Sequence, residues 1–276
     1  MAELVCSRLS PELSYISVGF SPRARRKRTL RLCDQGRDAG VKKPTPVLEL
    51  IDCWLKEPGT RWGYYLFEEI NLRVERNEVV VVVGENGTGK TTLMDLLAGY
   101  NTPSKGKLLL NGKRSNSNNL GKAVGSVFQF PGNYFLGSTI LDELIVGRDY
   151  ATPDLVREVM KQVGLYDVSL LQNPRQLSGG QKRRLSLASQ LMRQPMPEVL
   201  IMDEPLAGID RRGHRGIVEL IENLKNQMAV VIVTHDPGIL LTCADRMVQL
   251  SHKKIWPIPE SVVHRGREVR HQRGEI

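Results

Sequence analysis

The sequence predicts an α/β fold with a mainly parallel core sheet. Strand-like and helix-like stretches alternate between residues 44 and 250, as expected when helices connect parallel strands. The clearest strand is the run of five valines at 79–83, which is apolar on both faces, as in a strand buried inside a parallel sheet. A glycine-rich turn follows, and Leu93, Leu96 and Leu97 then recur at helical spacing before Gly99 ends the helix.

Length and composition exclude several classes of protein. The chain has 276 residues, of which 41% are hydrophobic, enough for one large domain or two small ones. No apolar run approaches the roughly 18 residues that a membrane-spanning helix needs. The four cysteines lie far apart without a CxxC pair, which argues against a disulfide framework and a zinc site. We therefore expect a soluble globular protein in a reducing compartment.

The net charge of +9 comes from the two ends of the chain. Residues 1–43 hold ten Lys and Arg against four Asp and Glu, and residues 251–276 hold six against three. The body at 44–250 has equal numbers of each sign. A nucleic-acid-binding domain is expected to carry a basic face of its own. The neutral body therefore argues against nucleic acid as a partner.

The first 43 residues have the composition of a targeting segment. They combine a basic cluster at 23–28 with scattered serines, few acids and no sustained periodicity, which is typical of a disordered, cleavable organelle transit peptide. A solvated disordered tail and a nuclear-localisation signal are the alternatives. A secretory signal is disfavoured, because no apolar stretch follows a basic start. Residues 251–276 are expected to form a loosely packed basic extension.

The loop after the valine run carries a phosphate-binding motif. It matches GxxxxGK[ST] between a strand and a helix, the context that this pattern requires. Glycines let backbone N–H groups turn toward a triphosphate, and the helix N-terminus adds the positive end of its dipole. We expect Lys90 to contact the β- and γ-phosphates of ATP, Thr91 to bind Mg²⁺ and Thr92 to hold the helix start. The motif residues are Gly84, Glu85, Asn86, Gly87, Thr88, Gly89, Lys90 and Thr91.

Two carboxylates end a second predicted strand. The apolar run at 199–202 precedes Asp203 and Glu204, so both emerge at the carboxyl edge of the sheet, where α/β sites lie. Adjacent side chains on a strand point to opposite sides. We therefore assign Asp203 to Mg²⁺ and Glu204 to polarising the attacking water. Because strands often end in acidic residues, this assignment depends on the neighbouring motifs.

A pentapeptide at 177–181, Leu-Ser-Gly-Gly-Gln, gives the chain a specific resemblance. It matches the signature of the nucleotide-binding subunits of ATP-binding cassette (ABC) transporters, over about residues 46–250. Ser178 would cap a helix, and Gly179 and Gly180, with Gln181 after them, would let that helix start approach a γ-phosphate. The three cations at 182–184 are expected to form a solvated face. The resemblance implies the P-loop NTPase ABC ATPase fold, with a small antiparallel β subdomain and a helical signature subdomain at about 132–190.

The same resemblance implies roles for further residues. Gln129 corresponds to the Gln loop, which touches Mg²⁺ or the attacking water and contacts the membrane partner. Asp210 resembles part of the D-loop that links the two nucleotide sites of a dimer, and His235 resembles the switch histidine that contacts the γ-phosphate. An aromatic residue that stacks on adenine is expected where Glu57 stands. Trp62 is our choice among the aromatic residues nearby.

Within the family, the segment from Phe128 most resembles ATPases of energy-coupling-factor and cobalt-type importers, although Phe130 and Tyr134 depart from the usual Asn and Gln. With the leader, this resemblance suggests a chloroplast protein similar to the single-cassette, non-intrinsic proteins of the ABC transporter I family. It implies a peripheral ATPase at the stromal face of the inner envelope. Its partners would be a second cassette, identical or different, and separate transmembrane subunits that import a metal ion or small cofactor.

Other classes of cassette ATPase share these motifs. A soluble ATPase serving iron–sulfur cluster assembly or lipid traffic stays open as the alternative. A DNA-repair or chromosome-type ATPase would insert a long coiled coil between Thr91 and Ser178, where only 86 residues lie. A nucleotide-gated module without turnover is disfavoured, because Glu204 and Ser178 are both present.

Overall fold

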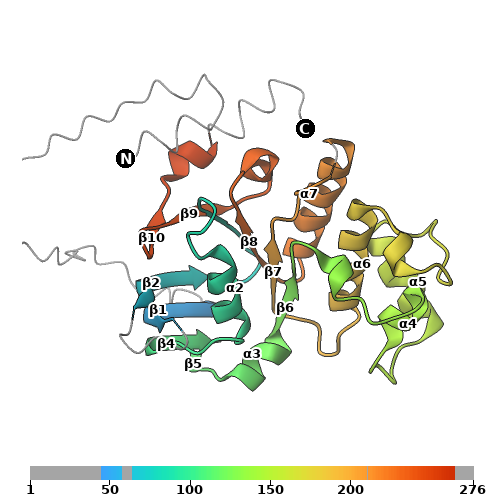
Figure 1. Ribbon diagram of the computed structural model, residues 1–276, viewed down its shortest axis with the longest axis horizontal. Coiled ribbons are helices and arrows are strands. Elements are labelled where there is room, and N and C mark those ends of the chain that lie inside the picture. The colour runs from blue at the N-terminus through green and yellow to red at the C-terminus, as the bar shows by residue number, and fades with distance from the viewer. Residues whose placement is uncertain (1–44, 58–63, 210, 265–276) are drawn as a thin grey trace, which may run out of the picture. The chain divides into compact units, whose positions relative to one another are not determined.

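The structure, a computed structural model, describes residues 45–57, 64–209 and 211–264 (Figure 1). The expected leader at 1–43, Trp62 and Asp210 lie outside these residues. Within them, no helix has the length and apolar character needed to cross a membrane.

The larger of two sheets contains the valine run at its centre. Its strands, in spatial order, are β10 (Lys254–Pro257), β9 (Arg246–Ser251), β3 (Val79–Val83), β8 (Ala229–Thr234), β7 (Val199–Asp203) and β6 (Val124–Val127). All neighbours from β9 to β6 pair in parallel, and every residue of β3, β7 and β8 is buried. This arrangement confirms the predicted parallel core sheet, and it brings the carboxyl ends of β3, β7 and β8 to one edge.

The smaller sheet is antiparallel, as the resemblance implies. Its strands, in spatial order, are β2 (Tyr65–Val74), β1 (Leu48–Lys56), β4 (Lys105–Leu110) and β5 (Lys113–Arg114). The helices follow the order α2 (Lys90–Ala98), α3 (Ser117–Ala123), α4 (Ile140–Ile145), α5 (Pro153–Gln162), α6 (Gly179–Leu191) and α7 (Arg211–Lys225). The smaller sheet and α2 lie on one side of the larger sheet, and α4 to α7 lie on the other (Figure 1).

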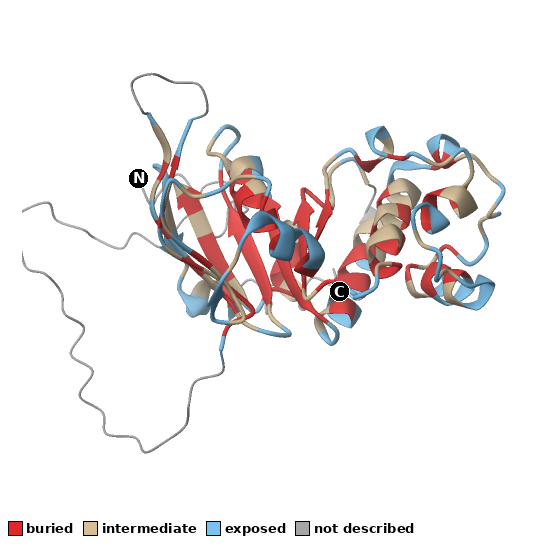
Figure 2. Ribbon diagram, turned by 90° about the horizontal axis from the view of Figure 1, so that it is seen from below, coloured by how far each residue is buried: buried red, intermediate tan, exposed pale blue. Residues whose placement is uncertain are grey.

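Alternate residues of β3 enter two separate cores. Val79 and Val81 pack with the core formed by α5, α6 and α7, whereas Val80 and Val82 pack with the core shared by α2 and the antiparallel sheet. Figure 2 shows the strands of the larger sheet buried between these two layers. The phosphate loop that leaves β3 is therefore anchored by a strand that is packed on both faces.

Residues 252–257 continue the larger sheet and are not the loosely packed extension expected from their composition. His252 and Lys253, both with positive φ (49° and 64°), turn β9 into β10, which pairs antiparallel with β9. The carbonyl of Lys253 accepts from the Glu68 N–H at 3.0 Å, and Lys254 Nζ lies 2.7 Å from Glu69 Oε2. The prolines of this segment favour a loose extension in the sequence analysis, but β10 is an edge strand, where a missing backbone N–H is tolerated.

Candidate active site

The loop at 84–89 requires glycine at its last position. Gly89 has φ of 96°, and a Cβ there would lie 2.9 Å from the Phe67 ring. Gly87 also has a positive φ, 82°. In the part of the chain that the structure describes, no side chain caps the N-terminus of α2. The first N–H groups of α2 are therefore available to an anion.

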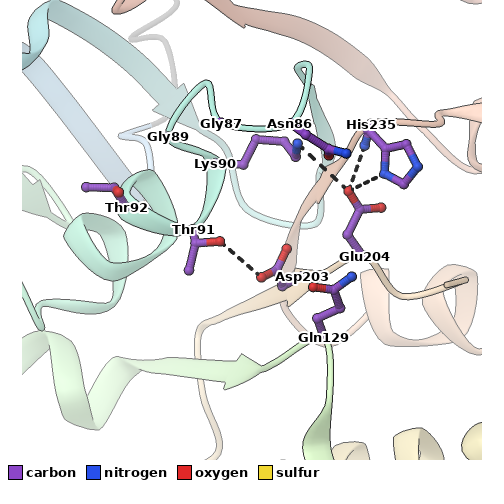
Figure 3. A pocket seen from close by; sticks show the side chains of 10 residues that line it. All are labelled: Asn86, Gly87, Gly89, Lys90, Thr91, Thr92, Gln129, Asp203, Glu204 and His235. Atoms are coloured by element: carbon purple, nitrogen blue, oxygen red, sulfur yellow. Dashed lines mark hydrogen bonds and ion pairs between the residues drawn. The ribbon is translucent and has the colours of Figure 1, made fainter.

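This loop lines a cavity of about 410 Å³ together with residues from three other strand ends (Figure 3). Gln129 lies shortly after β6, Asp203 ends β7 and Glu204 follows it, and His235 follows β8. The remaining lining residues belong to the loop and to the start of α2; they are Asn86, Gly87, Gly89, Lys90, Thr91 and Thr92. The structure thus brings the predicted phosphate, metal and catalytic residues to one place.

Lys90 is buried within the loop. Its Nζ donates to the carbonyls of Gly84 at 2.9 Å and Glu85 at 3.0 Å, and it lies 3.9 Å from Glu204 Oε1. Its positive charge therefore faces the part of the cavity that holds the carboxylates. A phosphate there would offer Lys90 a charge-assisted partner, which is stronger than a neutral carbonyl.

Thr91 and Asp203 bring together two oxygen atoms of the kind that binds Mg²⁺. The Thr91 hydroxyl donates to Asp203 Oδ2 at 3.4 Å, and the Gln129 side chain lines the same cavity. Burial raises the pKa of Asp203, and the neighbouring charge of Glu204 raises it further, while the Thr91 hydrogen bond and Lys90 act in the opposite direction. Mg²⁺ prefers oxygen ligands and would favour the ionised carboxylate. This donor set fits Mg²⁺.

Glu204 is fixed in both backbone and side chain. Its φ of 45° lies in the left-handed region, which residues other than glycine seldom adopt and which often marks functional sites. The buried carboxylate accepts from the Thr234 hydroxyl at 2.7 Å and from the His235 backbone N–H at 2.8 Å. His235 Nδ1 lies 2.7 Å from Glu204 Oε1. The His235 ring, 49% exposed, therefore lies between this carboxylate and solvent.

Thr234 contributes to the site although the sequence analysis does not name it. It is the last residue of β8 and is 3% exposed, so its hydroxyl is buried against Glu204. The available signal is a hydroxyl residue that ends an otherwise apolar strand next to a candidate histidine. A hydroxyl residue would also suit a strand end that has no part in a site, so the pattern alone does not distinguish a site residue from a structural one.

Arg183 is buried, which corrects the expectation of a solvated basic face at 182–184. It is 3% exposed and shares one face of α6 with Leu187 and Leu191, at spacings of four residues. Its guanidinium donates to the carbonyls of Gln129 at 2.8 Å, Pro205 at 2.6 Å and Ala207 at 3.0 Å. Three carbonyls replace water at the two terminal nitrogens, which helps the charge to be tolerated inside, while the buried Nε has no hydrogen-bond partner among the described residues.

The signature residues line a second cavity, of about 430 Å³. Ser178 Oγ accepts from the Gln181 N–H at 3.3 Å, and Gln181 Oε1 accepts from the Ser178 N–H at 3.0 Å, a capping box that starts α6. Gly179, Gly180, Gly208 and Ile209 also line this cavity. None of the described residues lines both cavities. One chain thus presents the phosphate loop and the signature at separate places.

Known proteins match most of this sequence. A sequence profile described as "ABC transporter" matches residues 67–207. The chain is 33% identical to ABC transporter I family member 11, chloroplastic, of Arabidopsis thaliana over 229 residues, which are 75% of this chain and 81% of that protein. It is also 33% identical to the energy-coupling factor transporter ATP-binding protein EcfA2 of Thermotoga maritima over 203 residues, 71% of this chain and 76% of that protein.

Solved structures resemble the fold. The structure of cbiO1 from Clostridium perfringens, described as part of the ABC transporter complex cbiONQ, superposes with a TM-score of 0.72 at 26% identity, covering 82% of this chain and 94% of that one. A nucleotide-free ATP-binding cassette from an ABC transporter gives a TM-score of 0.68 at 18% identity, with 79% and 94% covered, and it supports the fold alone.

Proposed function

This chain belongs to the ABC transporter family as an ATP-binding subunit, in a family that hydrolyses ATP, and we propose that it powers the import of a metal ion or small cofactor. The observation that carries the ATPase part of the proposal is the buried carboxylate of Glu204, held by Thr234 and His235 beside Lys90 in one cavity. The similarity to energy-coupling factor ATP-binding proteins supports the importer class.

The cavity holds the residues to which we assign phosphate binding and activation of the attacking water. In our proposal, the phosphates of ATP lie along the loop at 84–89, with Lys90 on the β- and γ-phosphates. Glu204 polarises a water whose oxygen attacks the γ-phosphorus, the bond between that phosphorus and the bridging oxygen breaks, and ADP leaves. The proton of the water passes to the Glu204 carboxylate, and His235 contacts the γ-phosphate.

Mg²⁺ would be held by Thr91, Asp203 and Gln129. When bound, it would neutralise charge that develops on the phosphate oxygens. The protein's own part is to orient these three side chains, and the short separation of the Thr91 and Asp203 oxygens supports a shared cation.

The separate cavities favour a composite site in a pair of cassettes. We propose a head-to-tail dimer in which each ATP lies between the phosphate loop of one chain and Ser178 to Gln181 of the other. The start of α6 offers the N–H groups of Gly179 and Gly180 and the positive end of its dipole to a γ-phosphate. The second cassette can be identical or different.

The leader and the chloroplastic relative support a location for this subunit. We propose that residues 1–43 are a transit peptide, that 44–250 form the ATPase domain, and that the mature chain associates with separate transmembrane subunits at the stromal face of the inner envelope. The Lys90→Ala variant would serve as a reference in testing for these partners, because it would not go through the cycle of ATP binding and hydrolysis.

Affinity purification of the tagged chain from detergent-solubilised organelle membranes tests the proposal. We expect transmembrane subunits to co-purify, and addition of purified ATP to a reconstituted complex to drive cargo uptake that Glu204→Gln abolishes. Recovery of soluble iron–sulfur assembly proteins without membrane subunits would instead support the alternative function.

A further inference from the structure

The contacts of Arg183 connect three segments that the ATPase reaction uses. The residue lies in the second turn of α6, five residues after the signature serine, Ser178. Two of its acceptors, the carbonyls of Pro205 and Ala207, belong to the turn directly after Glu204, and the third belongs to Gln129. We propose that Arg183 is a positioning residue that keeps Glu204 and Gln129 aligned with the signature helix.

The geometry of the acceptors favours arginine at this place. The three carbonyls are reached by the two terminal nitrogens of one planar guanidinium, with Nη1 serving Pro205 and Ala207 and Nη2 serving Gln129. A lysine carries the same charge but has one compact ammonium, which does not span acceptors in a plane in the same way. Burial lowers the pKa of Arg183, and the charges of Glu204 and Asp203 raise it. The buried cation therefore also balances the two carboxylates of the site.

The turn that Arg183 holds leaves Glu204 little freedom. The Ala207 N–H donates to the carbonyl of Glu204 at 3.1 Å, so residues 204–207 form one closed turn. Glu204 enters this turn with its φ of 45°, a backbone conformation that persists only when its surroundings hold it. Loss of the guanidinium would release the carbonyls of the turn on one side and that of Gln129 on the other.

The position of Arg183 also joins two nucleotide sites, an inference that rests on the proposed head-to-tail dimer. In that dimer, Ser178 to Gln181 face the ATP bound to the partner, whereas Glu204 and Gln129 act on the ATP of their own chain. Arg183 lies between these groups within one chain. A shift of α6 at one site would therefore move the catalytic groups of the other.

The first test compares Arg183→Gln with Lys182→Gln, which removes the neighbouring cation of α6. A misplacement of about 1 Å can cost on the order of 100-fold in rate. We expect Arg183→Gln to lower kcat by about 10- to 100-fold, while KM, ATP affinity and the number of ATP bound per chain stay within about twofold of wild type. Lys182→Gln should stay within about twofold in every measurement.

Turnover is expressed per ATP-binding chain, so that misfolded protein does not contribute. Arg183→Lys provides a second variant that keeps the charge and the apolar stem. It should recover part of kcat without changing KM. Equal kcat per ATP-binding chain in wild type and both variants would overturn the proposal, because a purely structural arginine changes the amount of folded protein only.

The second test asks which chain of a dimer needs Arg183. Mixing Ser178→Arg chains with Lys90→Ala chains leaves one complete site, which uses Glu204 of the Ser178→Arg chain. Adding Arg183→Gln to that same chain should lower the recovered ATPase about 10- to 100-fold, whereas adding it to the Lys90→Ala chain should change it less than about twofold. If Arg183→Gln lowered the recovered ATPase only when placed in the Lys90→Ala chain, Arg183 would act only on the conformation of the signature residues.

The two proposals fail in different ways. If the unmodified mixture recovers no ATPase, the composite dimer is wrong, and the kcat measurement on Arg183→Gln alone still decides the positioning role. If the unmodified mixture is active and both Arg183→Gln mixtures match it, the dimer stands and the positioning role is wrong.

Discussion

His235 contacts one oxygen of Glu204 twice, through its backbone N–H at 2.8 Å and its ring Nδ1 at 2.7 Å. The other oxygen of the carboxylate accepts from the Thr234 hydroxyl. Because an ionised carboxylate only accepts hydrogen bonds, the ring contact requires the hydrogen on Nδ1. Both oxygens of the base are therefore held by two consecutive residues at the end of β8, and Oε2, which accepts a single hydrogen bond from the described residues, keeps an acceptor site for a water.

Glu204→Gln should leave ATP binding intact and lower hydrolysis at least about 100-fold, because positioned general-base catalysis typically contributes about 10² to 10⁴. Phosphate release and nucleotide binding are measured on the same protein. Glu158→Gln, an exposed carboxylate on α5, is the matched control and should behave as wild type. Hydrolysis by Glu204→Gln at the wild-type rate would contradict the assignment of the base.

Lys90→Ala should weaken ATP binding by about tenfold or more, because it removes the buried cation that faces the phosphates and a charge-assisted hydrogen bond is worth about 1.5 to 3 kcal/mol. Titration with a fluorescent ATP analogue measures the effect. Lys161→Ala, at an exposed position of α5, controls for the general loss of a positive charge. Unchanged affinity would place the triphosphate elsewhere.

Mixing Ser178→Arg protein with Lys90→Ala protein should restore ATPase that neither has alone. A mixed dimer retains one site built from two intact halves, and transition-state charge is stabilised best when fixed donors enclose it on both sides. Recovery of up to about a quarter of the wild-type activity is expected from random pairing, since half of the dimers are mixed and each has one site of two. A wild-type rate from Ser178→Arg alone would argue against a composite site.

Asp203→Asn should stabilise the protein without ligands while abolishing metal-dependent hydrolysis. Burial raises the pKa of Asp203 in the folded state, so the folded chain holds this proton more tightly than the unfolded chain does. Stability from this group is therefore lost as pH rises from the ordinary carboxyl range through the raised folded pKa. The amide removes this loss.

Thermal unfolding of wild type and Asp203→Asn in the presence of a chelator, between pH 4 and pH 8, measures this loss of stability. The melting temperature of wild type should fall relative to that of Asp203→Asn as pH rises, and added Mg²⁺ with ATP should reduce the difference. A constant difference across this range would show that Asp203 is not the titrating group.

The leader should direct a fused fluorescent protein to plastids, and a chain that begins at Val41 should still fold and bind ATP. All the nucleotide motifs lie after that position. Microscopy of the fusion and ATP titration of the shortened chain measure the two parts. Loss of ATP binding in the shortened chain would show that residues 1–40 have a structural role.

Local sequence patterns predicted most of the site because its residues stand at strand ends. The phosphate loop follows β3, Asp203 ends β7 and His235 follows β8, so the parallel sheet itself brings them together. Arg183 was misplaced because a run of three cations resembles a solvated face, and its acceptors are backbone carbonyls that no side-chain pattern reveals. The pairing of Lys254 with Glu69 was also missed, since it depends on the antiparallel sheet lying beside β10.

The central place of β3 has a consequence for the chain during synthesis. Its two neighbours in the sheet are β8 and β9, since Val79 pairs with Val230 and Val80 with Arg246. Both strands leave the ribosome long after β3, and until then a run of five valines has two unpaired edges. Such a segment is prone to aggregate. β3 can therefore complete its pairing only after residue 249 has been synthesised, and a chain that stalls before that point would leave this valine run exposed.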